Sequence, residues 1–253
     1  MPDAGTLRGR AMDQNVTDAV ADAKQTLVEA GAILAHLGQG DMTRGHVSVR
    51  MPGAPDLFLM KPHSVGLDEI TPDIILTIGL DGVVVSGSAR RHSEVFIHSE
   101  IYRARPDVNA VIHAHPTYTV AFSSTGRALR PLCQGGALFA GWLPIFTATM
   151  QLIRSAEMGR KVAEALGPHQ AVLMRSHGVA MTGRTLEEAV TGCAMLEEAA
   201  RVQLLAEAAG IDIPDFPAED VVPLRRNLMN PDQHAVNFAY LARQAGVRPK
   251  LGS

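Results

Sequence analysis

Two histidines follow a short apolar stretch at a spacing of two residues, a pattern that could bind a metal ion. Residues 108–112 are mostly aliphatic and predict a short buried strand, and His113 and His115 follow it. Side chains two apart on a strand point to the same face, so both imidazoles can reach one cation. His177 follows a second apolar run, residues 171–174. Three such imidazoles suit a divalent metal with open positions for substrate.

A carboxylate precedes this strand and could complete the site. Ser93 is the predicted N-cap of a helix that starts near Glu94 and ends at about Arg105, before Pro106. Glu94 would then lie in the first helical turn. A favourable charge at a helix N-terminus explains such a residue equally simply, and single histidines are more often surface or core residues than ligands. The spacing therefore suggests a metal site without establishing it.

The elements that must position these residues alternate between strands and helices. Apolar periodicity predicts helices over residues 16–37, 119–124, 158–166 and 186–209. Strands are predicted over residues 47–51, 57–60, 74–79, 83–85, 171–174 and 179–182, with a hairpin turn at Asp81-Gly82. Residues 125–148 are rich in glycine and predict an irregular wall near the site or, equally, ordinary core packing. The pattern predicts an α/β fold with three layers, α/β/α, around a mixed, mainly antiparallel central sheet.

Length and composition bound the class of protein. The 253 residues, 46% of them hydrophobic, predict one domain over residues 1–253, with a loose arm over about 1–14 and a C-terminal tail over about 211–253. A net charge of −3 gives no electrostatic case for nucleic acid or an acidic membrane surface. No apolar run approaches the roughly 20 residues that span a bilayer. The widely spaced Cys133 and Cys193, without a signal peptide, favour a reducing cytoplasm.

The order of the motifs resembles that of the class II aldolase/adducin family, which includes fuculose-phosphate aldolase and ribulose-phosphate 4-epimerase. The resemblance covers roughly residues 20–210 and rests on GHVSVR at 45–50, MKPHSVG at 60–66, the S-E pair with a histidine after it, RPDVNAVIHAHP, and SHG about sixty residues later. It implies one divalent ion per subunit, Zn²⁺, Mn²⁺, Co²⁺ or Fe²⁺, on His113, His115 and His177. It implies that Glu94 is an acid/base and, in some members, a fourth ligand.

The family resemblance also implies a homotetramer with active sites at subunit interfaces. In relatives the C-terminal tail of one subunit reaches the neighbour's site. Tyr240 is therefore a candidate for substrate contact, with Arg225, Arg226 and His234 as further candidates for interface or substrate contact. A solvated terminal helix is the alternative for this segment.

Three histidines distinguish this chain from the sugar-phosphate members of the family. His46 stands where the aldolases have asparagine, His63-Ser64 replaces a Thr-Gly pair, and His92-Ser93 replaces a Ser-Ser pair. Small hydroxyl and amide groups beside backbone N–H groups suit a phosphate. Imidazoles would reshape that pocket and can donate to a carboxylate or a ring edge. We take these five residues as candidates for substrate binding.

A further departure weakens aldol cleavage as the reaction. The tyrosine proton donor of fuculose-phosphate aldolase has no counterpart near Gln134 or Gly135. Other members decarboxylate hydroxylated aromatic dicarboxylates, such as 3,4-dihydroxyphthalate and 3-hydroxy-2-methylpyridine-4,5-dicarboxylate, and this sequence resembles them in its histidine-bearing loops. We predict a metal-dependent lyase that decarboxylates a small hydroxylated aromatic or heteroaromatic carboxylate through a metal-stabilised enolate, with Glu94 moving the ring proton.

Two alternatives remain open at this point. One is an aldolase or epimerase that acts on a small hydroxy-carbonyl or sugar-phosphate substrate. The other is a non-catalytic, adducin-like module that uses the fold for protein interaction. Loss of activity should leave the ligands degraded, and all of them are present here, which argues against the second alternative.

Overall fold

The computed structural model describes residues 14–247, and its strands form one sheet. The strands are β1 (His46–Arg50), β2 (Leu57–Met60), β3 (Leu76–Gly79), β4 (Val84–Ser86), β5 (Ala110–Ala114), β6 (Ile145–Phe146), β7 (Ala171–Met174) and β8 (Gly178–Gly183). Their order is β4-β3-β2-β1-β5-β8-β7-β6, and β6–β7 is the parallel pair in an otherwise antiparallel sheet. The predicted mixed, mainly antiparallel sheet is confirmed.

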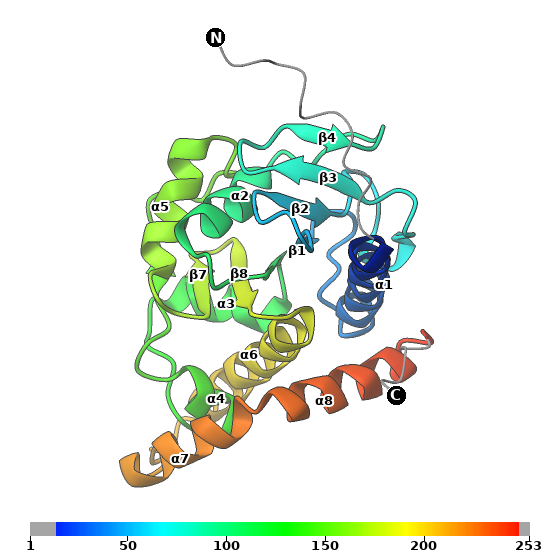
Figure 1. Ribbon diagram of the computed structural model, residues 1–253. Helices are drawn as coiled ribbons and strands as arrows, with labels where there is room; N and C mark the ends of the chain where they lie inside the picture. Colours follow the sequence, from blue (N-terminus) through cyan, green and yellow to red (C-terminus); the bar gives the residue numbers. More distant parts are fainter. Residues whose placement is uncertain (1–13, 248–253) are drawn as a thin grey trace.

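Helices cover both faces of this sheet (Figure 1). They are α1 (Gln14–His36), α2 (Val95–Ala104), α3 (Thr117–Thr125), α4 (Gln134–Phe139), α5 (Ala156–Leu166), α6 (Leu186–Ala208), α7 (Ala218–Leu228) and α8 (Pro231–Gln244), with a 3-10 turn, η1 (Leu67–Glu69). The predicted three-layer α/β/α arrangement is thus confirmed. The expected arm over about 1–14 lies almost wholly outside the described residues.

Two apolar cores, one on each face of the sheet, follow from strand alternation. On β5, Ala110, Ile112 and Ala114 pack toward α1, α6 and α8, whereas Val111 packs toward α2 and α5. Successive side chains of a strand point to opposite faces, so residue 113 shares its face with Val111. The alternation therefore directs His113 toward α2.

The segment 125–148 is more ordered than its composition indicates. It contains α4 and β6, and α4 packs on α6 and α7. Gly136 packs closely against the backbone of Arg130. A Cβ at this position would lie 2.5 Å from the carbonyl oxygen of Arg130, so a larger residue would not fit. No residue of 125–148 lines the cavity described below, so the expected wall near the site is wrong, and the burial of Leu138 and Phe139 supports the alternative of ordinary core packing.

The C-terminal segment folds back onto the domain as α7 and α8. Helix α8 buries Phe238 and Ala242 in the core formed with α1 and α6. Its first turn is capped by Asn230, whose side chain accepts from the backbone N–H of Asp232. The part of the expected tail beyond residue 247 lies outside the described residues.

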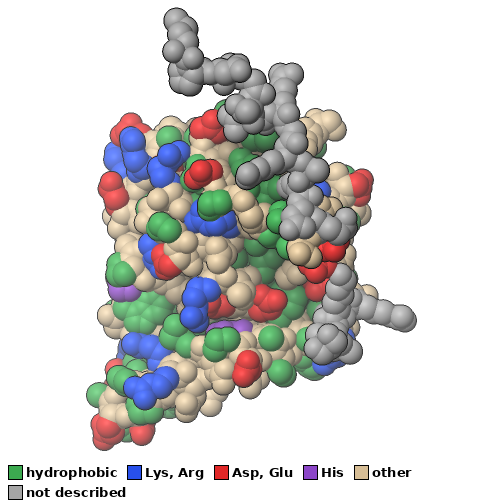
Figure 2. Space-filling view, viewed as in Figure 1, with side chains coloured by type: hydrophobic (Ala, Val, Ile, Leu, Met, Phe, Trp, Pro, Cys, Tyr) green, Lys and Arg blue, Asp and Glu red, His purple; other side chains and the backbone are tan. Residues whose placement is uncertain are grey.

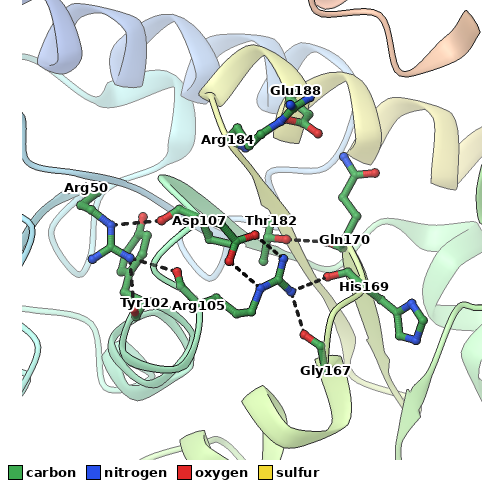
Figure 3. A network of polar contacts seen from close by, with 11 residues as sticks. Arg50, Tyr102, Arg105, Asp107, Gly167, His169, Gln170, Thr182, Arg184 and Glu188 are labelled. Carbon is green, nitrogen blue, oxygen red and sulfur yellow. Dashed lines mark hydrogen bonds and ion pairs between the residues drawn. The ribbon is translucent and has the colours of Figure 1, made fainter. Parts of the chain in front are cut away.

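Arg50 and Arg105 form hydrogen bonds with backbone carbonyl groups near the start of β5 (Figure 3). Arg50 donates to the carbonyl oxygens of Tyr102 and Arg105, at 3.0 and 3.2 Å. Arg105 pairs with Asp107 at 2.7 Å and donates to the carbonyl oxygens of Gly167 and His169. These bonds fix α2 and the loop after α5 relative to β5, at the end of this strand away from His113.

The surface carries mixed charge. On the face shown in Figure 2, acidic and basic side chains are interspersed among apolar ones. This distribution agrees with the small net charge of −3. Within residues 14–247, no helix combines the length and hydropathy needed to cross a bilayer.

Candidate metal centre and substrate cavity

The histidines of the H-A-H motif are placed by β5 and its pairing with β1. His113 lies inside β5 and is fully buried, and His46 lies directly opposite it on the antiparallel β1. Directly opposed residues have adjacent side chains on the same face, and the two rings are 4.8 Å apart between centroids. His115 follows the end of β5, with its ring centroid 4.7 Å from that of His113. The strand therefore gathers three imidazoles on the α2 face of the sheet.

A tight turn between β7 and β8 adds the fourth imidazole. Ser176 has a left-handed backbone with φ of 56°, and the backbone N–H of His177 donates to the carbonyl oxygen of Met174 at 2.9 Å. A Cβ at Gly178 would lie 2.4 Å from the carbonyl oxygen of Ala114 and 2.8 Å from the ring of His115. Only glycine allows this close approach. The turn brings the ring of His177 to 4.9 Å from that of His113, between centroids.

Glu94 reaches the same cluster from the start of α2. Glu94 is itself the N-cap residue, and the helix has no side-chain cap, so the prediction that Ser93 caps it is wrong. The Oε1 atom of Glu94 accepts from the backbone N–H of Ile153 at 2.9 Å. Its Oε2 atom lies 4.0 Å from Nε2 of His113. Oε1, besides accepting from Ile153, lies 3.8 Å from Nε2 of His177, so the chain before α5 holds the carboxylate with both oxygens near the histidines.

The geometry and chemistry of these side chains fit a divalent cation. One ligand atom each from His113, His115 and His177 lie within 4.8 Å of one another, and so do those of His46, Glu94 and His113. The Nδ1–H of His113 donates to the carbonyl oxygen of Val179 at 3.0 Å, which leaves a lone pair on Nε2. This Nε2 is buried without a hydrogen-bond partner, as are both ring nitrogens of His177. Buried orphan nitrogens of this kind match the ligand atoms of a metal site.

The buried site keeps these imidazoles neutral, as metal ligands must be. Burial lowers the pKa of His177 to about 4. Burial also lowers the pKa of His113 well below its usual value, with further lowering from His115 and His177. Burial raises the pKa of Glu94, although the N–H of Ile153 and the charge of Arg154 oppose this rise.

An outer carboxylate that was not predicted from the sequence lies beside His115. Oδ2 of Asp41 lies 3.1 Å from Nδ1 of His115, and Oδ1 accepts from Arg44 at 2.7 Å. Asp41 and Met42 both have left-handed backbones, with φ of 43° and 57°. Two such residues in sequence cost free energy that the rest of the fold must offset. The arrangement matches the carboxylate-histidine pairs that hold metal ligands in place.

Exchanging Asp41 for asparagine is expected to weaken metal binding by about 10- to 100-fold, the usual effect of losing such an outer partner. The amide can no longer stabilise a proton on Nδ1 of His115 with a full negative charge. Competition with a metal-binding dye measures the affinity. The exposed Asp212 provides the control, because Asp212→Asn makes the same chemical change beyond α6. Equal affinities in the two variants would contradict the role of Asp41.

The candidate ligands open into a cavity of about 1090 Å³. His115, His177 and Glu94 line it, whereas His113 and His46 lie below its floor. The other lining residues come mainly from loops: Asp41, Arg44, His63, Arg90, His92, Ser93, Thr117, Val120, Met150, Gln151, Leu152, Arg154 and Ser176. Such a volume suits a small-molecule substrate.

The predicted substrate-binding residues divide into four groups. His63, His92 and Ser93 line the cavity, whereas His46 is fully buried below its floor. Ser64 has a left-handed backbone with φ of 64°. Its Oγ atom lies 2.5 Å from Nδ1 of His63, so Ser64 can orient the His63 ring. Tyr240 is 53% exposed on α8, and within this chain the cavity lining includes no α8 residue. Its predicted contact with a neighbouring subunit stays a prediction.

Several cavity residues were missed in the sequence. Arg44, Arg90 and Arg154 line the cavity and give it positive charge, whereas Arg91 donates to the carbonyl oxygen of His92. Two exposed apolar side chains, Met150 and Leu152, form part of the wall. These loop residues have no periodicity and no recognisable spacing, so no signal in a single sequence pointed to them.

Acid is expected to destabilise the fold because the buried imidazoles are neutral. Burial lowers the pKa of His98, on α2, to about 3 and that of His92 to about 4. In an unfolded chain both would have a pKa of about 6.5. Below that pH the unfolded state binds more protons than the folded state, so stability is full above pH 6.5 and falls toward the folded pKa values. His98 alone should cost about 2 kcal/mol at pH 5.

Urea unfolding of metal-free protein at pH 7.5 and pH 5 measures this loss. His98→Gln should reduce the difference between the two pH values, since glutamine does not titrate. An unfolding midpoint that is the same at both pH values in the natural sequence would show that the imidazoles are not held neutral.

Comparisons with known proteins bear on this site. Residues 25–204 match the family model described as Class II Aldolase and Adducin N-terminal domain. Decarboxylase NovR of Streptomyces niveus is 38% identical over 181 residues, which are 71% of this chain and 67% of that protein. The 4-hydroxy-3-prenylphenylpyruvate oxygenase/4-hydroxy-3-prenylbenzoate synthase of Streptomyces roseochromogenus subsp. oscitans is equally identical over 181 residues, 71% of this chain and 65% of that protein.

A further relative and a solved structure match more of the chain. The 3,4-dihydroxyphthalate decarboxylase of Arthrobacter keyseri is 31% identical over 216 residues, covering 81% of this chain and 86% of that protein. The structure of L-fuculose 1-phosphate aldolase from Glaciozyma antarctica PI12 has a TM-score of 0.81 and 28% sequence identity, covering 94% of this chain and 95% of that one.

Proposed function

This chain belongs to the class II aldolase and adducin family, and from this premise we propose that it is a divalent-metal-dependent lyase that removes CO₂ from a small hydroxylated aromatic or heteroaromatic carboxylate. One observation carries the proposal: an intact set of three histidines and a buried carboxylate lies at a cavity lined by three arginines. The decarboxylase names of two relatives support the reaction type.

His113, His115 and His177 would hold the cation, with Glu94 beside them. A divalent ion there supplies a Lewis acid that stabilises negative charge on a substrate oxygen. The donor set suits Zn²⁺, Mn²⁺, Co²⁺ or Fe²⁺. Asp41 would keep the His115 ring in place, as its 3.1 Å contact with Nδ1 indicates.

Glu94 would move the proton of the reaction. The ring carbon that carries the carboxylate would first take a proton from the Glu94 carboxylic acid, which becomes a carboxylate, and the ionised hydroxyl beside it would become a ketone. The bond to the carboxylate would then break, CO₂ would leave, and the electron pair would return to the ring as an enolate with its negative charge on that oxygen. Burial raises the pKa of Glu94 and so favours the protonated form that this step needs. The N–H of Ile153, 2.9 Å from Oε1, would keep the carboxyl group in place through both states.

The rest of the cavity would bind and orient the substrate. Arg90 and Arg154 are available for a carboxylate, because guanidinium groups bind carboxylates in a planar, bidentate manner, and Arg44 adds positive charge beside them while paired with Asp41. His63 and His92 offer further hydrogen-bond donors beside them. Met150 and Leu152 would cover the face of the ring. This combination of charge and apolar surface favours an aromatic acid over a sugar phosphate.

Two other activities are distinguished by one set of assays. An aldolase or epimerase would act on a hydroxy-carbonyl compound, and the similarity to fuculose-phosphate aldolase structures favours testing it. An oxygenase would consume O₂, as the name of one Streptomyces relative indicates. Enzyme loaded separately with Mn²⁺, Zn²⁺, Co²⁺ and Fe²⁺ would be assayed for CO₂, carbonyl products and O₂ uptake. CO₂ release from an ortho-hydroxy aromatic acid without O₂ uptake supports the proposal, and carbonyl products alone would replace it with aldol cleavage.

We also propose that the chain forms a homotetramer in which the C-terminal helices lie at subunit contacts. Large apolar side chains are exposed from the end of α6 to α8: Leu205, Ile211, Phe216, Val222, Met229, Val236 and Tyr240. Several large, exposed apolar side chains along one segment are typical of a surface that binds another protein. A monomer in light scattering would contradict the proposal.

A further inference from the structure

Four buried polar side chains form a continuous line that leads to the metal centre. Nδ1 of His46 lies 2.6 Å from Nε2 of His98, and Nδ1 of His98 lies 2.6 Å from Oγ of Ser48. The Ser48 hydroxyl is in turn 2.8 Å from the hydroxyl of Tyr102. All four residues are no more than 1% exposed. The line joins the central sheet to α2 beneath the substrate cavity.

The fold places these side chains by simple periodicity. His46 and Ser48 are two residues apart on one face of β1, and His98 and Tyr102 are four residues apart on one face of α2. The line is anchored at its inner end by Arg50, whose guanidinium lies 4.7 Å from the centroid of the Tyr102 ring. The same arginine bonds the carbonyl oxygen of Tyr102 (Figure 3). Tyr102 therefore has little freedom to move.

The distances favour one direction for the hydrogen bonds. If Tyr102 donates to Ser48, Ser48 to His98 and His98 to His46, every bond is 2.8 Å or shorter. In the reverse direction the Tyr102 hydroxyl must donate to the carbonyl oxygen of Asn109 at 3.4 Å. That distance exceeds the usual O–H···O range. In the favoured direction Nδ1 of His46 accepts from Nε2–H of His98, so the proton of the neutral His46 ring is on Nε2.

The line can fix a tautomer, but it cannot supply a net proton. Passing a proton outward would leave a phenolate at Tyr102, and burial raises the pKa of that hydroxyl. The imidazoles also stay neutral, because burial lowers the pKa of His98 to about 3. Neither end of the line reaches solvent through these four side chains, which are all buried. Its effect on the site is therefore one of orientation.

We propose that His98 is a positioning residue that holds His46 in the tautomer with its proton on Nε2, so that His46 donates a hydrogen bond to the oxygen that gains negative charge at the site. This Nε2 is buried, has no partner, and lies 3.9 Å from Oε2 of Glu94. It is the ring nitrogen that faces the cluster of candidate ligands. The assignment rests on the proposed function for the role of that oxygen, but the tautomer can be tested without turnover.

The tautomer is measured by ¹⁵N NMR on Zn²⁺-loaded protein with labelled histidine, with His46 assigned through a His46→Gln variant. The expected result is a protonated Nε2 and an unprotonated Nδ1 on His46. His98→Leu should shift His46 toward the other tautomer. The matched control is Ser99→Ala, because Ser99 is the next residue of α2, is fully buried, and its hydroxyl has no partner. A proton on Nδ1 of His46 in the natural sequence would overturn the proposal.

Turnover provides a second readout. His98→Leu is expected to lower kcat by about 10- to 100-fold with KM within about threefold, as for other outer partners of a site. His98→Gln should restore most of this loss, since its amide N–H can donate to Nδ1 of His46. An unchanged kcat in a folded His98→Leu variant would overturn the role. If the natural enzyme shows the expected tautomer and releases no CO₂, the proposed function fails and the assignment of the tautomer stands.

Discussion

A His113→Ala variant is expected to lose its metal ion and, with it, turnover, by more than about 100-fold, because a direct ligand should matter more than an outer partner. His113 is the residue common to both groups of side chains that could hold a cation. Its Nδ1–H is already bonded to Val179, so Nε2 has a fixed direction toward the site. Metal content after dialysis, measured by elemental analysis, and kcat on the same sample give the two readouts.

Two further variants make this test specific. His113 is fully buried, and its loss also costs a hydrogen bond and leaves a small cavity. His177→Ala removes a ligand from a turn instead of a strand, so it should lose metal with less effect on folding. His36→Ala removes an exposed imidazole from the last turn of α1 and should change neither readout. Retained metal and activity in both site variants would show that the assigned centre is wrong.

Replacement of Glu94 by glutamine should separate metal binding from catalysis. We expect the variant to keep most of its metal and lose about 100- to 10,000-fold in kcat, the range usual for a positioned acid or base. The glutamine oxygen can still accept from the N–H of Ile153, so the side chain should stay where Glu94 lies. The amide cannot give up and regain a proton as the carboxyl group does.

Glu100→Gln is the matched control for this prediction. Glu100 is a buried glutamate within α2. Its Oε1 atom lies 3.6 Å from Nε of the more exposed Arg103. This change should leave metal content and kcat close to those of the natural sequence. If Glu94→Gln turned over substrate at an unaffected rate, Glu94 would have no acid/base role.

The sequence predicted the parts of the site that local geometry determines. The apolar run before His113 and the two-residue spacing to His115 placed both imidazoles on one side of a strand, although β5 includes His113 instead of ending before it. The run before His177 likewise matched β7. These predictions succeeded because strand periodicity depends on neighbouring residues alone.

Features that depend on pairing between distant segments could not be read in this way. His46 belongs to the site because the register of β1 and β5 sets it opposite His113, and register is a property of the folded sheet. His98 was part of a recognised motif, yet its role depends on the distance between α2 and β1. Asp41 and the cavity arginines come from loops, whose path is fixed by tertiary contacts.

CO₂ release that depends on a bound metal tests the central claim most directly. Enzyme would be stripped with a chelator, reconstituted with Mn²⁺, Zn²⁺ or Co²⁺, and given a panel of ortho-hydroxy aromatic dicarboxylates. The account predicts that at least one compound releases CO₂, that the chelator stops this release, and that added metal restores it. No CO₂ from any compound with any of these metals, together with cleavage of a hydroxy-ketone, would contradict the account and make the chain an aldolase.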